Sequence, residues 1–278
     1  MSDLIRQQGQ AMHFDKNAWV ILNPIEQSIK AKIEAKGTPL KDWDISIYRG
    51  ILTGCNEAFI ISGEKRKELI AKDAKSVEII RPILRGRDIK RYGYEFADLW
   101  LIATHNGYGD TPRVDINAYP AVKEHLDIYW KQIEKREDQG DTPYNLRCCA
   151  YMDDFSKQKI VYSEIVREAQ FYLDKTGEFF VEATSFLMTG KHLEYLLKMF
   201  HSKLITFAFK TYYAGGGLGE TGFRYKKAFF ELLPVIIPTE EIEQRAAKIG
   251  QNDIKSKNDF IYDLYDLTAE ERDFIDNQ

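Results

Sequence analysis

The stretch GILTGCNEAFII, Gly50 to Ile61, decides how the first half of the chain is interpreted, because two glycines bracket a threonine just before a short apolar run. It is not a Walker A loop, since no Gly-Lys-Ser/Thr follows, and it is neither GxGxxG nor GxSxG. It therefore predicts a turn that leads into a buried strand, EAFII. Cys55 has no base at a fixed spacing, so we interpret it as a small buried side chain rather than a nucleophile.

Outward from this stretch, helical and strand patterns alternate along the chain. Asn23, Pro24 and Glu26 form a capping-box pattern at the start of a helix, and Thr268 and Glu271 form another near the C-terminal end. Gly177 suits the turn of a hairpin. Helices are predicted over 23–37, 62–76, 119–138 and 190–204, strands over 57–61, 99–103, 159–166 and 232–238, and a hairpin over 170–183.

The composition changes at Pro238-Thr239, where mixed segments give way to acidic amphipathic helices. We therefore predict two parts, a domain over 1–238 and a helical tail over 239–278. The fold class expected is α+β, with a curved mixed β-sheet, flanking helices and a small helical tail.

Composition excludes several classes of protein. The chain has 278 residues, and no apolar run approaches the roughly 18 residues that a membrane span needs. Three cysteines, two of them adjacent, make a poor disulfide framework and a poor zinc site. We expect no metal in this chain and a reducing, cytoplasmic setting.

The net charge of −4 hides a local contrast. The segment 81–94 holds five basic residues and one acid, whereas 239–278 holds eleven acids and five bases. In the first segment, the basic residues are interleaved with Tyr92 and Tyr94, a pattern that suits phosphate contacts with aromatic packing. An ordinary charged surface remains the alternative for this segment.

The motifs for catalysis are incomplete. DTPY, residues 141–144, is similar to the Asp/Asn-Pro-Pro-Tyr motif that holds a flipped base, but threonine replaces the first proline and no glycine-rich cofactor loop precedes it. The adjacent Asp153 and Asp154 fit a turn or a helix cap better than a nuclease site. The run GGGLGETG, 215–222, lacks the context of a phosphate-binding loop, so we interpret it as a flexible loop between groove-lining segments.

Several segments together resemble a known family. These are GILTGCNEAFII, IIRPILRGRDIKRY, LWLIATH, EKREDQGDTPYNLRCCAY, KQKIVYSEI, LEYLLKMFHSKLITFAFK, FELLPVIIP and NDFIYDLYDLTAEE. In this order they resemble the C-terminal target-recognition domain, the TaqI-like specificity domain, of type IIG restriction-modification enzymes. The resemblance implies sequence-specific binding of double-stranded DNA. It also implies that the endonuclease, the N6-adenine methyltransferase and their cofactors, S-adenosylmethionine and magnesium, lie in domains that this chain lacks, with which the tail helices dock.

Candidate DNA contacts follow from residue type and position. We predict phosphate contacts from the basic patch and a second basic segment, and base-edge contacts from loops. The phosphate candidates are Arg85, Arg87, Lys90, Arg91, Arg224, Lys226 and Lys227, with Tyr92 packing beside them. The loop candidates are Arg49, Thr53, Asn56, His105, Asn106, Arg167, Gln170, Tyr212 and Tyr213. Two alternatives stay open: a protein-interaction module with little DNA contact, and a small enzyme that uses DTPY or the Asp153-Asp154 pair.

Overall fold

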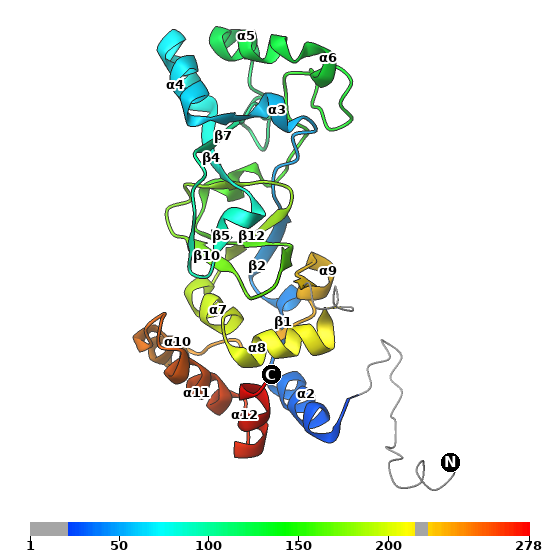
Figure 1. Ribbon diagram of the computed structural model, residues 1–278, viewed down its shortest axis with the longest axis vertical. Helices are drawn as coiled ribbons and strands as arrows, with labels where there is room; N and C mark the ends of the chain where they lie inside the picture. Colours follow the sequence, from blue (N-terminus) through cyan, green and yellow to red (C-terminus); the bar gives the residue numbers. More distant parts are fainter. Residues whose placement is uncertain (1–21, 215–221) are drawn as a thin grey trace, which may run out of the picture.

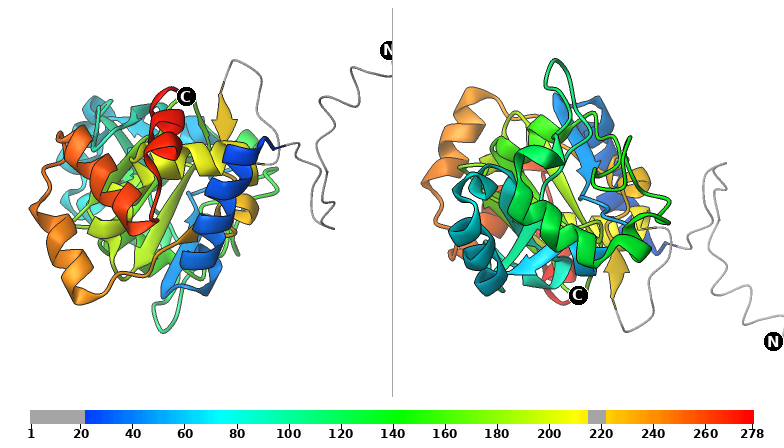
Figure 2. Two further views of the ribbon diagram at one scale, coloured as in Figure 1. Left: turned by 90° about the horizontal axis from the view of Figure 1, so that it is seen from below. Right: turned by 90° about the horizontal axis from the view of Figure 1, so that it is seen from above.

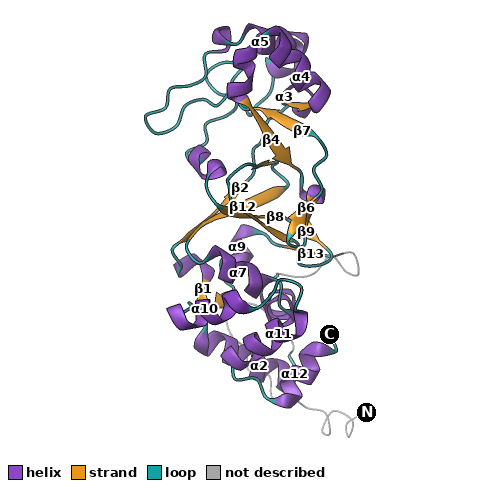
Figure 3. Ribbon diagram, turned by 90° about the vertical axis from the view of Figure 1, so that its left-hand side faces the viewer, coloured by secondary structure: helices purple, strands orange, loops and turns teal. Residues whose placement is uncertain are grey.

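A computed structural model describes residues 22–214 and 222–278. Within them the chain is elongated, with helices at both ends and strands between them (Figures 1 and 3). The lower end, which we call the helical base, contains α2 (Pro24–Lys36), α7 (Leu193–Phe200), α8 (Lys203–Ala208), α10 (Glu240–Lys248), α11 (Ile254–Leu264) and α12 (Ala269–Asp276). The upper end contains α3 (Asn56–Phe59), α4 (Gly63–Lys72), α5 (Pro120–Ile128) and α6 (Trp130–Ile133).

The strands form two four-stranded sheets. The central sheet has the order β10-β8-β12-β2 and is antiparallel, and the upper sheet has the order β11-β4-β7-β3 with one parallel pair, β11-β4. The strands of the central sheet are β2 (Ile45–Arg49), β8 (Lys159–Ser163), β10 (Phe171–Asp174) and β12 (Ser185–Gly190). Those of the upper sheet are β3 (Ile60–Ser62), β4 (Ile80–Leu84), β7 (Leu99–Ile102) and β11 (Phe180–Val181).

Shorter elements complete the fold. Three two-stranded pairs join β1 (Thr38–Pro39) to β14 (Pro234–Val235), β5 (Ile89–Lys90) to β6 (Gly93–Tyr94), and β9 (Ile165–Val166) to β13 (Phe223–Arg224). The remaining turns and short helices are η1 (Leu40–Asp42), η2 (Ala74–Ile79), η3 (Gly86–Asp88), η4 (Ile116–Ala118), η5 (Met152–Ser156), η6 (Phe209–Tyr213) and α9 (Lys227–Phe230). The predicted α+β class with a helical tail is confirmed, and the strands are divided among several sheets.

Two hydrophobic cores meet at the central sheet, because its strands bury both faces. In β8, Ile160 and Tyr162 point into the core shared with the helical base, whereas Val161 points into the core shared with the upper sheet. The side chains of a strand alternate between its faces, so a fully buried strand reads as a continuous apolar run. The central sheet thus ties the two ends of the molecule together.

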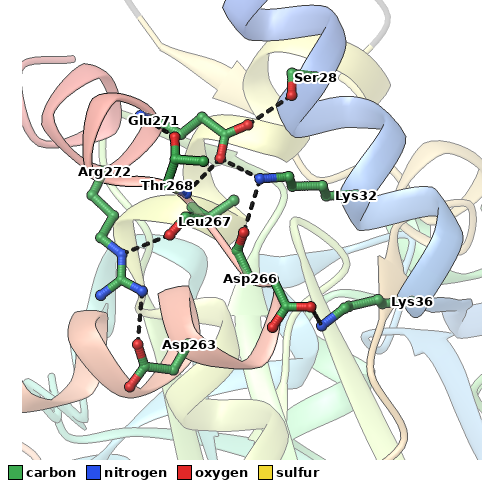
Figure 4. Close-up of polar contacts among 9 residues, drawn as sticks. All are labelled: Ser28, Lys32, Lys36, Asp263, Asp266, Leu267, Thr268, Glu271 and Arg272. Atoms are coloured by element: carbon green, nitrogen blue, oxygen red, sulfur yellow. Dashed lines mark hydrogen bonds and ion pairs between the residues drawn. The ribbon is translucent and has the colours of Figure 1, made fainter.

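The tail helices belong to the helical base. Glu271, at the start of α12, accepts hydrogen bonds from Ser28 and Lys32 of α2 at 2.7 and 2.6 Å (Figure 4). Burial acts to raise the pKa of Glu271, but the hydrogen bonds from Lys32 and Ser28 outweigh it and hold the pKa below its usual value. Tyr265, which directly follows α11, lies in the same core as Ile29 of α2. The segments on either side of residue 238 therefore share one core here.

The two glycines of the opening stretch carry the chain from the central sheet to the upper sheet. The Gly50 amide donates to the carbonyl of Ser185 at 2.8 Å, and a Cβ on Gly50 would lie 2.1 Å from the carbonyl oxygen of Glu182. Gly54 has a φ of +68°, which glycine adopts without strain. The predicted turn is confirmed, but the strand begins later than predicted: residues 56–59 form α3, and only 60–62 form β3.

Other sequence predictions need correction. Residues 170–183 were predicted as a hairpin, but β10 pairs with β8 and β11 pairs with β4 in the other sheet. Gly177 does take a positive φ of 69°, because the chain turns there between the two sheets. The helix predicted over 119–138 breaks at Tyr129 into α5 and α6 and ends at Ile133. The capping boxes at Asn23 and Thr268 are both confirmed.

Candidate nucleic-acid interface

A basic and aromatic surface lies where β2 ends. We call Tyr48, Arg49, Arg147, Tyr151, Lys226 and Lys227 the basic-aromatic face. The rings of Tyr48 and Tyr151 stack with centroids 4.3 Å apart and planes 6° from parallel, and the Lys227 ammonium lies 5.9 Å from the Tyr48 centroid. Burial and the neighbouring Cys149 raise the pKa of Tyr151. The positive charges of Arg147 and Arg49 oppose this shift, so both guanidinium groups lie near the phenol.

Three parts of the chain supply this face. Tyr48 and Arg49 end β2, Tyr151 precedes η5, Lys226 precedes α9, and Lys227 is the first residue of that helix. In Figure 1 the green loop after α6 and the gold helix α9 lie on the same, right-hand side, and the view from above in Figure 2 agrees. The charged ends are open to solvent: the side chains of Arg147 and Lys227 are 57% and 46% exposed.

Four of the predicted DNA contacts lie on or beside this face. Arg49, Lys226 and Lys227 belong to it, and all three are exposed. Arg49 donates through Nε to the carbonyl of Ala183 at 2.8 Å, which directs its side chain along the end of β12. Asn56 is exposed and donates through Nδ2 to Glu182 at 3.0 Å, one residue before Ala183.

Thr53 was predicted as a base contact, and its burial argues against that role. The residue is 1% exposed. Its hydroxyl donates to Asn56 Oδ1 at 2.5 Å and accepts from the amide of Cys55 at 3.2 Å. Its carbonyl accepts from Arg136 at 2.5 Å. Thr53 therefore shapes the turn, and Asn56 presents the exposed amide.

The basic segment 81–94 does not form one continuous surface. Arg85 makes a two-point ion pair with Asp88, at 2.9 and 2.8 Å, that closes the η3 turn. Hydrogen bonding to Asp88 raises the pKa of Arg85, so its charge is largely committed within the chain. Arg87 is exposed, and Lys90 lies 3.2 Å from Glu95.

Arg91 and Tyr92 fasten the β5-β6 pair to the helical base. Arg91 donates to the carbonyl of His201 at 3.1 Å, and the Tyr92 hydroxyl accepts from Lys257 at 2.9 Å. Burial lowers the pKa of His201 to about 3, so the imidazole is neutral, and its Nε2 accepts from the amide of Phe171 at 3.2 Å. This segment runs down the left-hand side of Figure 1, opposite α9. The two groups of predicted basic contacts thus lie on different sides.

The predicted loop contacts Tyr212 and Tyr213 lie in the helical base. Their hydroxyls donate to the carbonyl of Glu26 at 2.8 Å and to the carboxylate of Glu34 at 3.2 Å, both on α2. Burial raises the pKa of each phenol. Their hydrogen bonds are made within the fold, which argues against a role in base reading. Of the predicted loop 215–222, residues 215–221 lie outside the described residues.

The next four predicted contacts lie at two places, at or just after the β9-β13 pair and in the loop after β7. Arg167 is exposed, Gln170 is half-buried, and Arg224 lies 4.0 Å from Glu164 at the β9-β13 pair. His105 is half-buried, and its Nδ1 accepts from the amide of Gly107 at 3.3 Å. Burial, with the charge of Arg81, lowers the pKa of His105.

Asn106 is held by the loop after α6. It donates through Nδ2 to Cys148 Sγ at 3.1 Å and so lies next to Arg147.

Residues that sequence reasoning missed include Tyr48, Arg147 and Tyr151, since no motif links three positions so far apart. Arg136 was missed as well. It is 6% exposed, and its guanidinium donates to four backbone carbonyls, those of Thr53, Asp138, Pro143 and Asn145. This one side chain joins the turn of the opening stretch to the loop that carries Arg147.

The polar groups of the candidate catalytic motifs make hydrogen bonds within the fold. Within DTPY, the Tyr144 hydroxyl donates to Asp127 at 2.5 Å, and the carbonyl of Pro143 accepts from Arg136. Asp154 accepts from Thr189 at 2.8 Å within the η5 region. Among the residues that the structure describes, no group of His, Cys, Asp or Glu side chains could hold a metal ion. None of the helices in residues 22–214 and 222–278 combines the length and apolarity that crossing a bilayer requires.

Comparison with known proteins decides the family. The profile of the TaqI-like C-terminal specificity domain matches residues 81–235, more than half of the chain. The chain belongs to this family. The specificity domain is similar in fold to the type IIL restriction-modification enzyme MmeI, solved in complex with DNA, with a TM-score of 0.58 and 13% identity over 87% of this chain. It is also similar to the type IIG restriction endonuclease BpuSI, with a TM-score of 0.53 and 14% identity over 89% of this chain.

The specificity domain is shorter than these two enzymes. It spans 37% of the MmeI chain and 33% of the BpuSI chain. No curated protein matches its sequence. The predicted resemblance to the TaqI-like specificity domain is confirmed by the profile match.

Proposed function

We propose that this specificity domain binds double-stranded DNA and recognises a particular sequence for a type IIG restriction-modification enzyme. The observation that carries the proposal is the basic-aromatic face on a member of this family. In this proposal the chain is not catalytic. Strand cleavage and N6-adenine methylation, with S-adenosylmethionine and magnesium, belong to other domains of the parent enzyme, and the assembly works in the cytoplasm.

The charges of the face suit a phosphate backbone. Arg147 pairs with Asp138 at 3.0 Å and Lys227 with Glu231 at 3.5 Å, and all four side chains are at least partly exposed. Exposed pairs of this kind contribute about 0–1 kcal/mol, so exchanging a carboxylate for a phosphate costs little. Each phosphate that is neutralised releases condensed counterions, which favours binding at low salt. A chain with a net charge of −4 can therefore bind DNA through a local surface.

The stacked tyrosines give this face a rigid centre. The two rings stack on each other at 4.3 Å and pack, half-buried, against the core, so β2 and the segment before η5 hold them in a fixed position beside the cations. Rigid aromatic groups lose little conformational entropy on binding and pack against sugars or bases. The face thus combines mobile cations with a fixed apolar platform.

Selection of duplex DNA from a random pool at low salt, followed by a salt series, tests the proposal. We expect a motif of a few base pairs and an affinity that falls steeply with salt. The variant Arg147→Ala/Lys226→Ala/Lys227→Ala should lose about 2.7 from the slope of log K against log salt, since each phosphate contact contributes about 0.9. The matched control is Lys175→Ala/Lys191→Ala/Lys203→Ala, which removes three exposed, ion-paired cations away from the face. If wild-type protein retains no duplex at low salt, the proposal is wrong and a protein-interaction module is favoured.

A further inference from the structure

Two surface loops, 103–115 and 134–150, are joined along their backbones. The amide of Leu146 donates to the carbonyl of Thr104 at 2.8 Å, and the hydroxyl of Thr104 donates to the carbonyl of Tyr144 at 2.7 Å. Thr104 is fully buried, so these bonds are shielded from water. The two loops, which α5 and α6 separate in the sequence, thus act as one rigid unit.

A buried asparagine adds a second connection. Asn145, 2% exposed, donates to the carbonyl of Val114 at 2.9 Å and accepts from the Thr142 hydroxyl at 2.6 Å. Gly140 lies against the side chain of Asn106, where a Cβ would come within 2.5 Å of the amide carbon and oxygen. Glycine at this position therefore lets the Asn106 side chain lie flat on the second loop.

Three polar side chains meet at the outer end of this unit. We call Asn106, Arg113 and Asp141 the loop cluster. Asn106 accepts from the amide of Asp141 at 2.8 Å and donates to its carboxylate at 3.0 Å. Arg113 donates to the other carboxylate oxygen at 3.2 Å. Among the described residues this is the single hydrogen bond of the Arg113 guanidinium. Its other N–H groups therefore remain available to a ligand or to water.

Stability does not explain this arrangement. The side chains of Arg113 and Asp141 are 45% and 63% exposed, and an ion pair of that exposure contributes about 0–1 kcal/mol. The backbone bonds of Thr104, Asn145 and Gly140 already fix the loops. The loop cluster is instead a preorganised set of donors and acceptors presented to solvent.

We propose that the loop cluster reads a G·C base pair in the DNA that the specificity domain binds; this inference rests on the proposed function. Arginine donates to O6 and N7 of guanine, and a carboxylate accepts from N4 of cytosine in the major groove. Arg113 and Asp141 present those two groups side by side. Asn106 is the positioning residue, because it donates one hydrogen bond to the carboxylate of Asp141 and accepts another from the backbone amide of the same residue.

The cluster is placed to act together with the basic-aromatic face. Asn106 contacts Cys148, whose neighbour Arg147 belongs to that face. An exposed carboxylate opposes DNA binding unless the DNA itself donates a hydrogen bond to it, so Asp141 should favour duplexes that offer a cytosine amino group and disfavour others. Attraction by the face and discrimination by Asp141 are thus separate functions of adjacent residues.

The test compares the motifs selected from a random duplex pool by wild type, Arg113→Ala and Asp141→Asn. We expect both variants to lose preference at one G·C position by about 10- to 100-fold while their salt slope changes by less than one. Asparagine keeps the shape of Asp141 but offers a donor as well as an acceptor, so it should relax the choice rather than abolish binding. The controls are Lys191→Ala and Asp44→Asn, which alter an exposed ion pair, at 2.7 Å, on another part of the surface.

Each outcome decides one of the proposals. A motif with a G·C position that both variants relax and both controls keep supports the inference. A wild-type motif that survives unchanged in Arg113→Ala and Asp141→Asn overturns the inference and leaves the proposed function standing. Salt-dependent binding by wild type without any motif also overturns it. No binding at low salt overturns the proposed function and the inference together. Thermal unfolding should show both variants folded, because the replaced groups are exposed.

Discussion

Replacing Arg136 by methionine should loosen the loop that carries Arg147 without removing any residue from the surface. The guanidinium donates to the carbonyls of Thr53 and Asp138 at 2.5 Å each and of Pro143 at 3.0 Å, and also to that of Asn145. Methionine has a similar length but donates nothing. The carbonyls of Thr53, Asp138 and Pro143 would then need water, whereas that of Asn145 keeps the amide of Gly140 at 2.9 Å, and the loop would have to open to admit water.

The expected loss of stability is the difference between the hydrogen bonds of Arg136 and the cost of burying its charge. Hydrogen bonds from a charged donor contribute about 1.5–3 kcal/mol each, or about 6–12 kcal/mol for four. Burial lowers the pKa of Arg136 to about 10, which corresponds to a net cost of about 3 kcal/mol for keeping the guanidinium charged in this environment. Partial relaxation of the loop reduces the remainder, so we expect a loss of about 3–5 kcal/mol in the free energy of unfolding. For a chain of this size the melting temperature should fall by roughly 10 °C.

Denaturant unfolding and amide hydrogen exchange measure this effect. We expect exchange in residues 137–147 to accelerate more than exchange in the central sheet. Arg147→Met is the matched control, because Arg147 is 57% exposed with one ion pair and should cost less than about 1 kcal/mol. Arg136→Lys should fall between the two, since one ammonium cannot reach all four carbonyls. A loss below 1 kcal/mol in Arg136→Met, with loop protection unchanged, would refute the reasoning.

Three other predictions concern the sheets and the helical base. Gly50→Ala should destabilise the fold by several kcal/mol, because its Cβ would overlap the carbonyl of Glu182 at 2.1 Å; unfolding within about 0.5 kcal/mol of wild type would contradict this. Lys159→Met should cost about 3–5 kcal/mol in the free energy of unfolding, because it removes the ammonium that lies 2.6 Å from the buried carboxylate of Asp174 and leaves that charge unpaired. Adding Asp174→Asn should recover part of the loss, and strictly additive losses in the double variant would argue against a coupled pair. Burial, with the charges of nearby cations, lowers the pKa of Lys257 to about 8, so the unfolded chain binds more protons between pH 8 and 10.5 and stability gains a rising contribution in that window. Lys257→Met should remove that rise, and parallel stability curves for the two proteins over this pH range would show the assignment to be wrong.

Local signals in the sequence predicted many elements of the fold. The capping boxes at Asn23 and Thr268 are local, since each is completed within four residues, and both are formed. The hairpin predicted around Gly177 failed because pairing is not local. The sequence specified a positive φ at that residue, but β11 finds its partner in β4, about a hundred residues earlier. Which strands pair depends on the tertiary arrangement of both sheets, which no local pattern contains.

The candidate site was predicted less well, for the same reason. Composition singled out Lys226 and Lys227 as basic residues beside aromatic ones, and both are exposed on the basic-aromatic face. Composition also singled out Arg85 and Tyr212, whose polar groups the fold uses internally. A charge or a phenol has the same appearance in a sequence whether its partner is solvent or a carbonyl elsewhere in the chain.

The way the loops are held bears on how a specificity domain can change its target. The buried groups that fix the two loops, Arg136, Asn145 and Thr104, all donate to backbone carbonyls. Every residue type supplies a carbonyl, so these bonds do not depend on which side chains the loops carry. The exposed pair of Arg113 and Asp141 contributes little to stability. Substitution there can alter the base that is read at small cost to the fold, whereas substitution at Arg136 disturbs the loop whatever it reads.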